Sequence, residues 1–78
     1  MKSVEFLKKF KEDEKLSFRK MAKQAGTSEA YWHQIFDQNR PPTLQKADGI
    51  ARGMGIKRDT FLHIVFRDRM LKFLEKHI

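Results

Sequence analysis

Residues 16–37 read LSFRKMAKQAGTSEAYWHQIFD and contain two short helical patterns separated by one glycine. Ser17 is a good N-cap for the first pattern, and Gly26 is suited to end it because glycine readily takes the left-handed conformation that follows many helices. Thr27 or Ser28 can cap the second pattern. A connection this short sets two helices at a steep angle, so the sequence predicts a second helix that projects from the body of the protein.

Three more helices are expected around this pair. Ser3 is a candidate N-cap for the first helix and Thr43 for the fourth, while the fifth begins after Ile56. The five expected helices cover residues 3 to 12–15, 17–25, 28–37, 43 to 53–55, and 58–76. The sequence therefore predicts a single all-α domain over residues 1–78, with a compact five-helix fold and a long C-terminal helix.

Composition limits the classes of function. The 78 residues include no cysteine, which excludes disulfides and thiolate metal sites, and a domain of this size leaves little room for a catalytic cleft. The histidines His33, His63 and His77 lack metal-ligand spacing. We therefore expect no enzyme activity, metal, cofactor or small-molecule substrate. The longest apolar run, residues 64–66, is too short to span a bilayer, and no signal-peptide core begins the chain, so a cytoplasmic protein is expected.

The distribution of charge is uneven along the chain. The formal net charge is +7 and the isoelectric point is about 10.0, a balance that favours polyanions, nucleic acid before acidic membranes. Residues 1–26 carry eight basic and four acidic groups, as do residues 41–78, whereas residues 27–40 have a net charge of −1. If the middle segment touches nucleic acid, we expect it to touch bases while the flanking segments hold the backbone.

Residues 16–62 resemble the λ-repressor-like (Cro and C1, XRE-type) helix-turn-helix family. The matching positions are Met21–Ala22, Gly26, Ser28, Ile35, Asn39 to Thr43, Ile50–Ala51 and Met54 to Ile56. The segment AGTSEAYWHQI, residues 25–35, is particularly similar to small phage-type Cro-like repressors and related antitoxins. The resemblance implies a helix-turn-helix over residues 17–37 whose second helix reads the major groove of double-stranded DNA.

The resemblance also implies which residues meet DNA bases. Ser28, Glu29, Ala30 and Gln34 fall where the family's recognition helix meets base edges. Gln34 can form two parallel hydrogen bonds with adenine, and Ala30 can pack against a thymine methyl group. Glu29 can accept a hydrogen bond from a cytosine amino group, although an acidic residue at a helix start is equally explained by the helix dipole.

Phosphate contacts are expected on both sides of this helix. By resemblance, the start of the preceding helix and the loop after the recognition helix contact the DNA backbone, and exposed cations add to that footprint. The expected phosphate contacts are Ser17, Phe18, Arg19, Lys20, Lys23, Tyr31, Asn39, Arg40 and Thr43. Tyr31 can alternatively pack its ring on the body of the protein. Phe18, Phe36 and Gln38 depart from the glutamine, glutamate and glycine that are common at these positions in the family.

The apolar residues divide between a core and a surface stripe. Trp32 continues the surface of Met21 and Ile35, so we expect it in the core, with stacking on an unpaired base as the alternative. The residues of the C-terminal helix expected to close the core are Phe61, Leu62 and Val65. The residues then left as an exposed stripe are Phe66, Met70, Phe73 and Leu74.

An exposed apolar stripe usually marks a partner surface, so we expect a homodimer through residues 61–78. A two-fold dimer would separate two recognition helices by about 34 Å, which matches a near-palindromic operator. The alternative is a monomer in which the stripe folds back onto the first helix, at Phe6, Leu7 and Phe10.

These observations favour a phage-type or bacterial transcriptional repressor that binds DNA and catalyses no reaction. The first alternative is an antitoxin or adaptor that uses the helix-turn-helix as a scaffold for a protein partner. The second is binding to a membrane surface by the basic, amphipathic residues 66–78, against which the acidic Asp68 and Glu75 argue because they interrupt the basic face.

Overall fold

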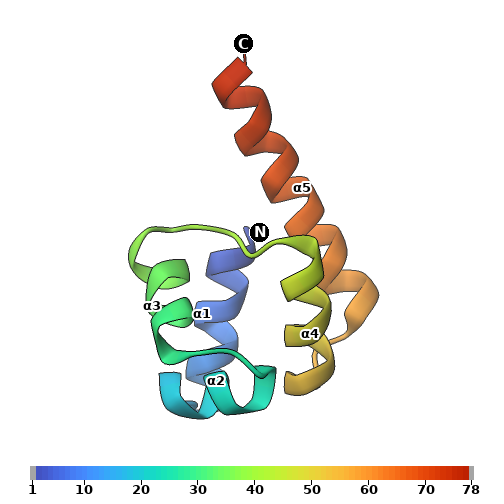
Figure 1. The fold of residues 1–78 in the computed structure, drawn as a ribbon. Helices are drawn as coiled ribbons and strands as arrows, with labels where there is room; N and C mark the ends of the chain where they lie inside the picture. Colours follow the sequence, from blue (N-terminus) through green and yellow to red (C-terminus); the bar gives the residue numbers. More distant parts are fainter. Residues whose placement is uncertain (1, 78) are drawn as a thin grey trace.

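The computed structural model describes residues 2–77, and all its regular structure is helical. The helices are α1 (Ser3–Asp13), α2 (Phe18–Ala25), α3 (Glu29–Asp37), α4 (Leu44–Met54) and α5 (Arg58–His77). The prediction of an all-α, five-helix chain is therefore confirmed. The principal extents are 38 × 25 × 21 Å, and the long dimension follows α5, whose last turns project beyond the other helices (Figure 1).

Three of the expected N-caps are present. The side-chain oxygens of Ser17, Ser28 and Thr43 accept hydrogen bonds from the backbone N–H groups three residues later, at 3.1, 3.2 and 3.2 Å. Gly26 ends α2 with φ of 68° and Gly55 ends α4 with φ of 69°, the left-handed conformation that suits glycine at a helix end. Local sequence thus accounts for where α2, α3 and α4 begin and for where α2 and α4 end.

The expectation for Ser3 is wrong. Lys2 is the N-cap of α1, without a side-chain hydrogen bond, and Ser3 is the first helical residue. The Ser3 hydroxyl donates to Oδ2 of Asp68 at 2.6 Å, and its backbone N–H donates to the same oxygen at 3.2 Å. Both residues are buried, so a carboxylate from α5 satisfies the start of α1. Asp68 consequently does not interrupt an exposed basic face on α5.

The core contains Met21, Trp32 and Ile35, as the spacing of apolar residues predicted. Trp32 is fully buried, so it is not available for stacking on a base. Phe61 and Val65 close the core as expected, while Leu62 is half-buried. The largest fully buried side chains are Trp32, Phe61, Leu7, Met21, Ile35, Ile50, Val4 and Val65. The alternative in which the stripe folds back onto α1 is not observed, because Phe66, Met70, Phe73 and Leu74 are all exposed.

A glycine sets how closely α4 approaches α2. A Cβ atom at Gly53 would lie 2.0 Å from the backbone oxygen of Gln24 and 3.1 Å from Cα of Ala25. Because both are backbone atoms, no side-chain rotation relieves the overlap. Gly53 therefore allows the last turn of α4 to pack directly on the end of α2, which supports the turn leading to α3.

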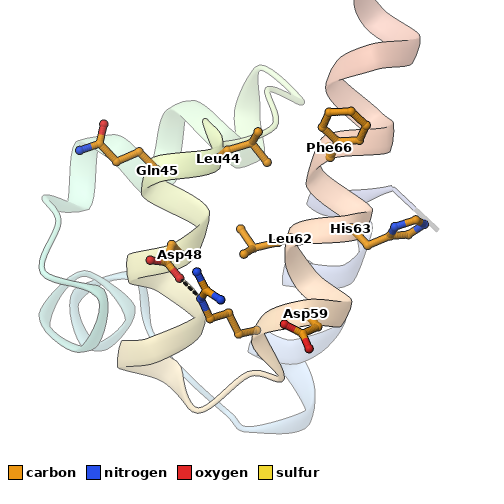
Figure 2. A pocket seen from close by; sticks show the side chains of 8 residues that line it. Leu44, Gln45, Asp48, Asp59, Leu62, His63 and Phe66 are labelled. Carbon is orange, nitrogen blue, oxygen red and sulfur yellow. Dashed lines mark hydrogen bonds and ion pairs between the residues drawn. The ribbon is translucent and has the colours of Figure 1, made fainter.

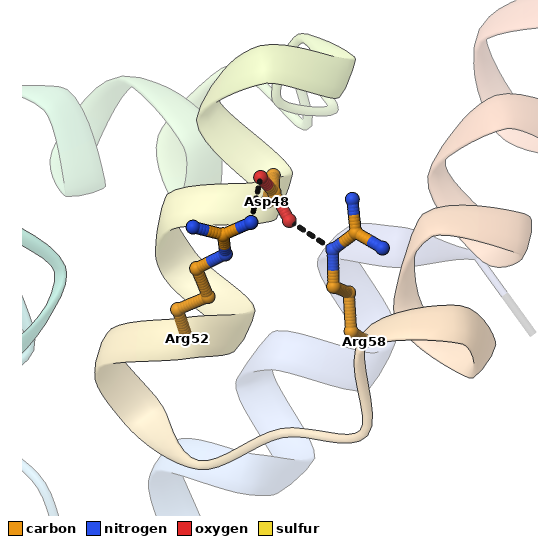
Figure 3. A network of polar contacts seen from close by, with 3 residues as sticks. All are labelled: Asp48, Arg52 and Arg58. Carbon is orange, nitrogen blue, oxygen red and sulfur yellow. Dashed lines mark hydrogen bonds and ion pairs between the residues drawn. The ribbon is translucent and has the colours of Figure 1, made fainter.

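A polar network connects α4 with the beginning of α5 (Figure 3). Asp48 accepts a hydrogen bond from Nε of Arg58, and an amino group of Arg52 lies 3.4 Å from its second carboxylate oxygen. The hydrogen bond from Arg58, together with the charge of both arginines, holds the pKa of Asp48 below its ordinary value. Arg52 lies in the last turn of α4 and Arg58 at the start of α5, on either side of the α4–α5 turn, which is at the opposite end of α4 from the loop that follows α3 (Figure 1).

Candidate nucleic-acid interface

Helix α3 is attached to the body by one side and exposed on the other. Trp32 and Ile35 are 0% and 2% exposed and fix the helix to the core. All four residues expected to contact bases are exposed: Ser28, Glu29, Ala30 and Gln34. Burial of these side chains under the rest of the fold would exclude contact with bases. Because all four are exposed, such contact is sterically possible.

The exposed side of α3 carries no cation. Between Glu29 and Asp37 the helix has two acidic residues and no lysine or arginine. His33 and Asp37 lie one turn apart, with Nδ1 3.9 Å from a carboxylate oxygen, and both are exposed. A helix of this charge does not attract phosphate, so any contact with nucleic acid would depend on hydrogen bonds and apolar contacts with bases.

One edge of α3 is bordered by cations from α1. The ammonium group of Lys8 lies 6.0 Å from the ring centre of Phe36, and that of Lys11 lies 5.0 Å from the ring centre of Phe18. The two phenylalanine rings are in edge contact, with centres 5.2 Å apart. This pair of rings therefore carries two positive charges to the side of α3 nearest α1 and α2.

The opposite edge is bordered by cations from three other segments. The ammonium group of Lys46 lies 5.7 Å from the ring centre of Tyr31. A cavity of about 240 Å³ beside α3 is lined by Tyr31, Gln34, Arg40 and Arg69, among others. Positive charge thus lies along both edges of a helix that itself has none, an arrangement that composition indicated only coarsely.

Most residues expected to contact phosphate are exposed, but they do not form one surface. The exposed members are Ser17, Arg19, Lys20, Lys23, Asn39, Arg40 and Thr43. Arg40 lines the cavity that also contains Gln34. Lys20 instead lines a different cavity, with Phe10 of α1, Glu14 at the C-cap of α1 and Met54 of α4, and no residue of α3 lines that cavity. Of these two cations, Arg40 is the one that the fold brings beside α3.

The structure gives Tyr31 and Phe18 packing roles. The Tyr31 hydroxyl is buried without a hydrogen-bond partner, so in this conformation it does not face a phosphate. Burial raises the pKa of Tyr31, against the opposing effect of the charges on Arg69 and Arg40. The half-buried ring of Phe18 packs against His33, with ring centres 4.3 Å apart. A phosphate contact at Phe18 therefore has only its backbone N–H to use.

Three cations near α3 were missed from the sequence. Arg69, Lys72 and Lys76 of α5 line a cleft with Arg40 and Pro41 of the loop after α3. Their spacing of three and four residues puts them on one side of a helix, a signal present in the sequence. The spacing does not predict which loop the cationic side of α5 faces. That depends on the contact between Lys72 and the backbone oxygen of Asn39, which are 33 residues apart.

A second exposed surface lies between α4 and α5 and combines apolar with charged side chains. Leu44 points from α4 toward α5, and Leu62 points back from α5, beside Phe66 (Figure 2). These three apolar residues line a groove of about 630 Å³ together with Gln45, Asp48, Arg58, Asp59 and His63. The groove continues along α5 into exposed apolar residues, with exposed fractions of 53% for Phe66, 46% for Met70, 42% for Leu71, 58% for Phe73 and 40% for Leu74.

Neither a metal centre nor a membrane span is found in the described part of the chain. Across residues 2–77, no three potential metal-ligating side chains lie close enough to hold an ion, and no helix has the length and apolarity needed to cross a bilayer. No family model matches the chain, and no curated protein or solved structure is significantly similar to it.

Proposed function

We propose that this protein is a sequence-specific, DNA-binding transcriptional regulator, of the phage-type or bacterial repressor kind. In this proposal α2 and α3 form a helix-turn-helix of the λ-repressor-like type, and α3 enters the major groove. One observation carries the proposal: α3 is held by a buried face, presents an exposed face without cations, and has positive charge along both edges.

The dimensions and chemistry of duplex DNA fit this arrangement. An α-helix with side chains is about 10–12 Å across, and the major groove is about 12 Å wide. Gln34 would read adenine, Ala30 a thymine methyl group and Glu29 a cytosine amino group. The cations at the two edges would neutralise phosphates on the strands that border the groove, so the acidic Glu29 would meet bases rather than phosphates.

A second copy of the chain is the proposed occupant of the apolar surface on α5. Arg67, Leu71 and Glu75 are spaced i, i+4 and i+8, so they form one ridge along the flank of the stripe. Antiparallel pairing of two α5 helices centred on Leu71 brings Arg67 of each copy opposite Glu75 of the other. This complementarity supports self-association, and the resulting two-fold axis suits a near-palindromic operator.

A protein partner of another kind, as for an antitoxin or adaptor, is the competing function. The observation that favours it is the groove of Leu44, Leu62 and Phe66, which extends the apolar surface beyond α5. This function predicts that the purified protein shows no affinity for duplex DNA even at low salt. DNA binding by the purified chain would therefore decide against it as the main role of the fold.

The proposal is tested by selecting binding sites from random duplex DNA and then measuring affinity against salt concentration. We expect a defined site and a linear fall of log K with log salt. Arg40→Ala should weaken binding to all sequences alike and make the slope shallower by about 0.9, the value for one phosphate contact. Arg52→Ala, at the far end of α4, is the matched control and should leave the slope unchanged. Failure of the wild-type chain to bind any duplex would refute the proposal.

A further inference from the structure

The loop after α3 and the projecting part of α5 form a basic cleft of about 500 Å³. Its wall on the loop side is Arg40 and Pro41. On the α5 side it is lined by Arg69, Lys72, Phe73, Lys76 and His77. Of the described residues that line it, none is acidic. Four permanent positive charges therefore surround one concave surface.

The cations on α5 are aligned and two of them are anchored. Arg69, Lys72 and Lys76 follow one side of the helix over about 10 Å, from the rise of 1.5 Å per residue. The ammonium group of Lys72 donates to the backbone oxygen of Asn39 at 2.7 Å, and a guanidinium nitrogen of Arg69 donates to the backbone oxygen of Pro42 at 3.4 Å. These contacts orient the side chains without neutralising them, because a carbonyl carries no net charge.

No ion pair within residues 2–77 involves these four cations; the pairs that are present use Asp37 and Asp48. Arg40, Lys72 and their neighbours thus repel one another with no compensating anion from the described chain. Several aligned, unpaired cations in a concave site are the arrangement that recognises a chain of phosphates. One strand of duplex DNA advances about 3.4 Å along the axis per phosphate and also winds around it, so its phosphates lie farther apart than 3.4 Å and a row of about 10 Å reaches about two of them.

The cleft is continuous with the exposed side of α3. Arg40, Pro41 and Arg69 line both the basic cleft and the neighbouring cavity that contains Gln34. A duplex lying on α3 would therefore bring its backbone to the mouth of the cleft. Phe73, at the border of the apolar stripe, lines the cleft, whereas Phe66 and Met70 do not, so contact with DNA through the basic side leaves Phe66 and Met70 free for a second copy.

We propose that this cleft binds backbone phosphates of the duplex that α3 reads, so that Lys72 and Lys76 extend the DNA contact onto α5. The inference depends on the proposed DNA-binding function and adds a second phosphate site to it. In this arrangement one helix serves both assembly, through its apolar side, and DNA affinity, through its basic side.

The test compares two double variants of equal net charge. The first is Lys72→Gln with Lys76→Gln, and the second is Arg52→Gln, in the last turn of α4, with Lys57→Gln, in the turn before α5. Binding to a random-sequence duplex is measured against salt concentration, after thermal melts establish that both variants fold. The first variant should make the slope of log K against log salt shallower by about 1.8, for two phosphate contacts. The second should retain the wild-type slope.

A wild-type slope for the Lys72 and Lys76 variant, with normal binding by the wild-type chain, would overturn the cleft assignment and leave DNA reading by α3 intact. A shallower slope in that variant, combined with a Gln34→Ala protein of unchanged sequence preference, would support the cleft and refute reading by α3. In the last experiment the wild-type chain and the Lys72 and Lys76 variant are mixed with vesicles that contain anionic phospholipid. If the variant loses vesicle binding but binds DNA as the wild-type chain does, the cleft is assigned to a membrane and the proposal is overturned.

Discussion

Helix α3 and the last three turns of α5, residues 66–77, both face solvent, but they differ in how they are held and in what they expose. Helix α3 is fixed along its length by Trp32 and Ile35 and exposes polar groups. The end of α5 projects beyond the body, exposes apolar side chains on one side and cations on the other, and is anchored mainly near its beginning (Figure 1). The difference suggests a division of roles, with sequence reading on the rigid helix and affinity and assembly on the projecting one.

The largest expected effect is on stability, and it differs between α3 and the end of α5. Trp32→Ala should lower the free energy of unfolding by about 3–5 kcal/mol, because a fully buried aromatic ring is replaced by a cavity. Phe73→Ala removes an exposed ring and should change stability by no more than about 0.5 kcal/mol at a concentration where the chain is monomeric. Urea denaturation measures both. Equal losses in the two variants would mean that α3 and the end of α5 are packed alike.

The next effect concerns assembly. Leu74→Asp puts a charge beside Leu71 in the proposed contact between two α5 helices and should weaken the dimer by about 2 kcal/mol, roughly 30-fold in dissociation constant. Sedimentation equilibrium measures the mass of the variant and of the wild-type chain. Glu12→Ala, an exposed substitution on α1, serves as the control and should leave the mass unchanged. A wild-type chain that remains monomeric at high concentration would contradict the assembly role of α5.

The third prediction tests how the projecting helix is tied to the body. Asp68→Ala leaves the buried Ser3 hydroxyl and N–H without their acceptor, so stability should fall by about 1–3 kcal/mol. Ser3→Ala removes one donor while Asp68 keeps the backbone N–H, and a smaller loss is expected. Thermal unfolding of the two variants shows which substitution lowers stability more. If Ser3→Ala lowered stability more than Asp68→Ala, the Asp68 carboxylate would not be the group that ties α5 to the start of α1.

The smallest effect is at the α4–α5 turn, where the α5 helix begins. The lowered pKa of Asp48 means that the unfolded chain binds the proton more tightly, so the stabilisation by Arg58 and Arg52 is present above the ordinary aspartate pKa of 3.8. It is lost as the pH falls through the lower folded-state value. Asp48→Asn should therefore lower the melting temperature slightly at neutral pH, and the difference should vanish in acid. A difference that grows on acidification would reverse the assigned sign.

Local signals predicted the regions whose structure depends on nearby residues. Ser17, Gly26, Ser28 and Thr43 act within four residues of their own positions, so their roles in starting and ending helices could be identified from the sequence. The periodic apolar positions likewise predicted the burial of Trp32, although the neighbours of its ring were not predictable. What sequence periodicity determines is the side of a helix that is buried.

Contacts between distant segments could not be predicted in the same way. Ser3 satisfies every local rule for an N-cap, but Asp68 competes for its hydroxyl from 65 residues away. The hydroxyl of Tyr31 was expected to reach phosphate, but the packing of α3 buries it. The basic cleft depends on which side of α5 faces the loop after α3, and that orientation is set by the tertiary packing of α5 on the body.

The most direct test of α3 as the reading helix is the specificity of a Gln34→Ala protein. The wild-type chain and the variant are titrated with the selected duplex and with random duplex at one salt concentration. We predict that the affinity for random DNA is unchanged. The free-energy difference between binding the selected duplex and binding random duplex should fall by about 1–3 kcal/mol, the value of one paired contact to a base. A variant that keeps both the preferred site and the wild-type ratio would contradict the account.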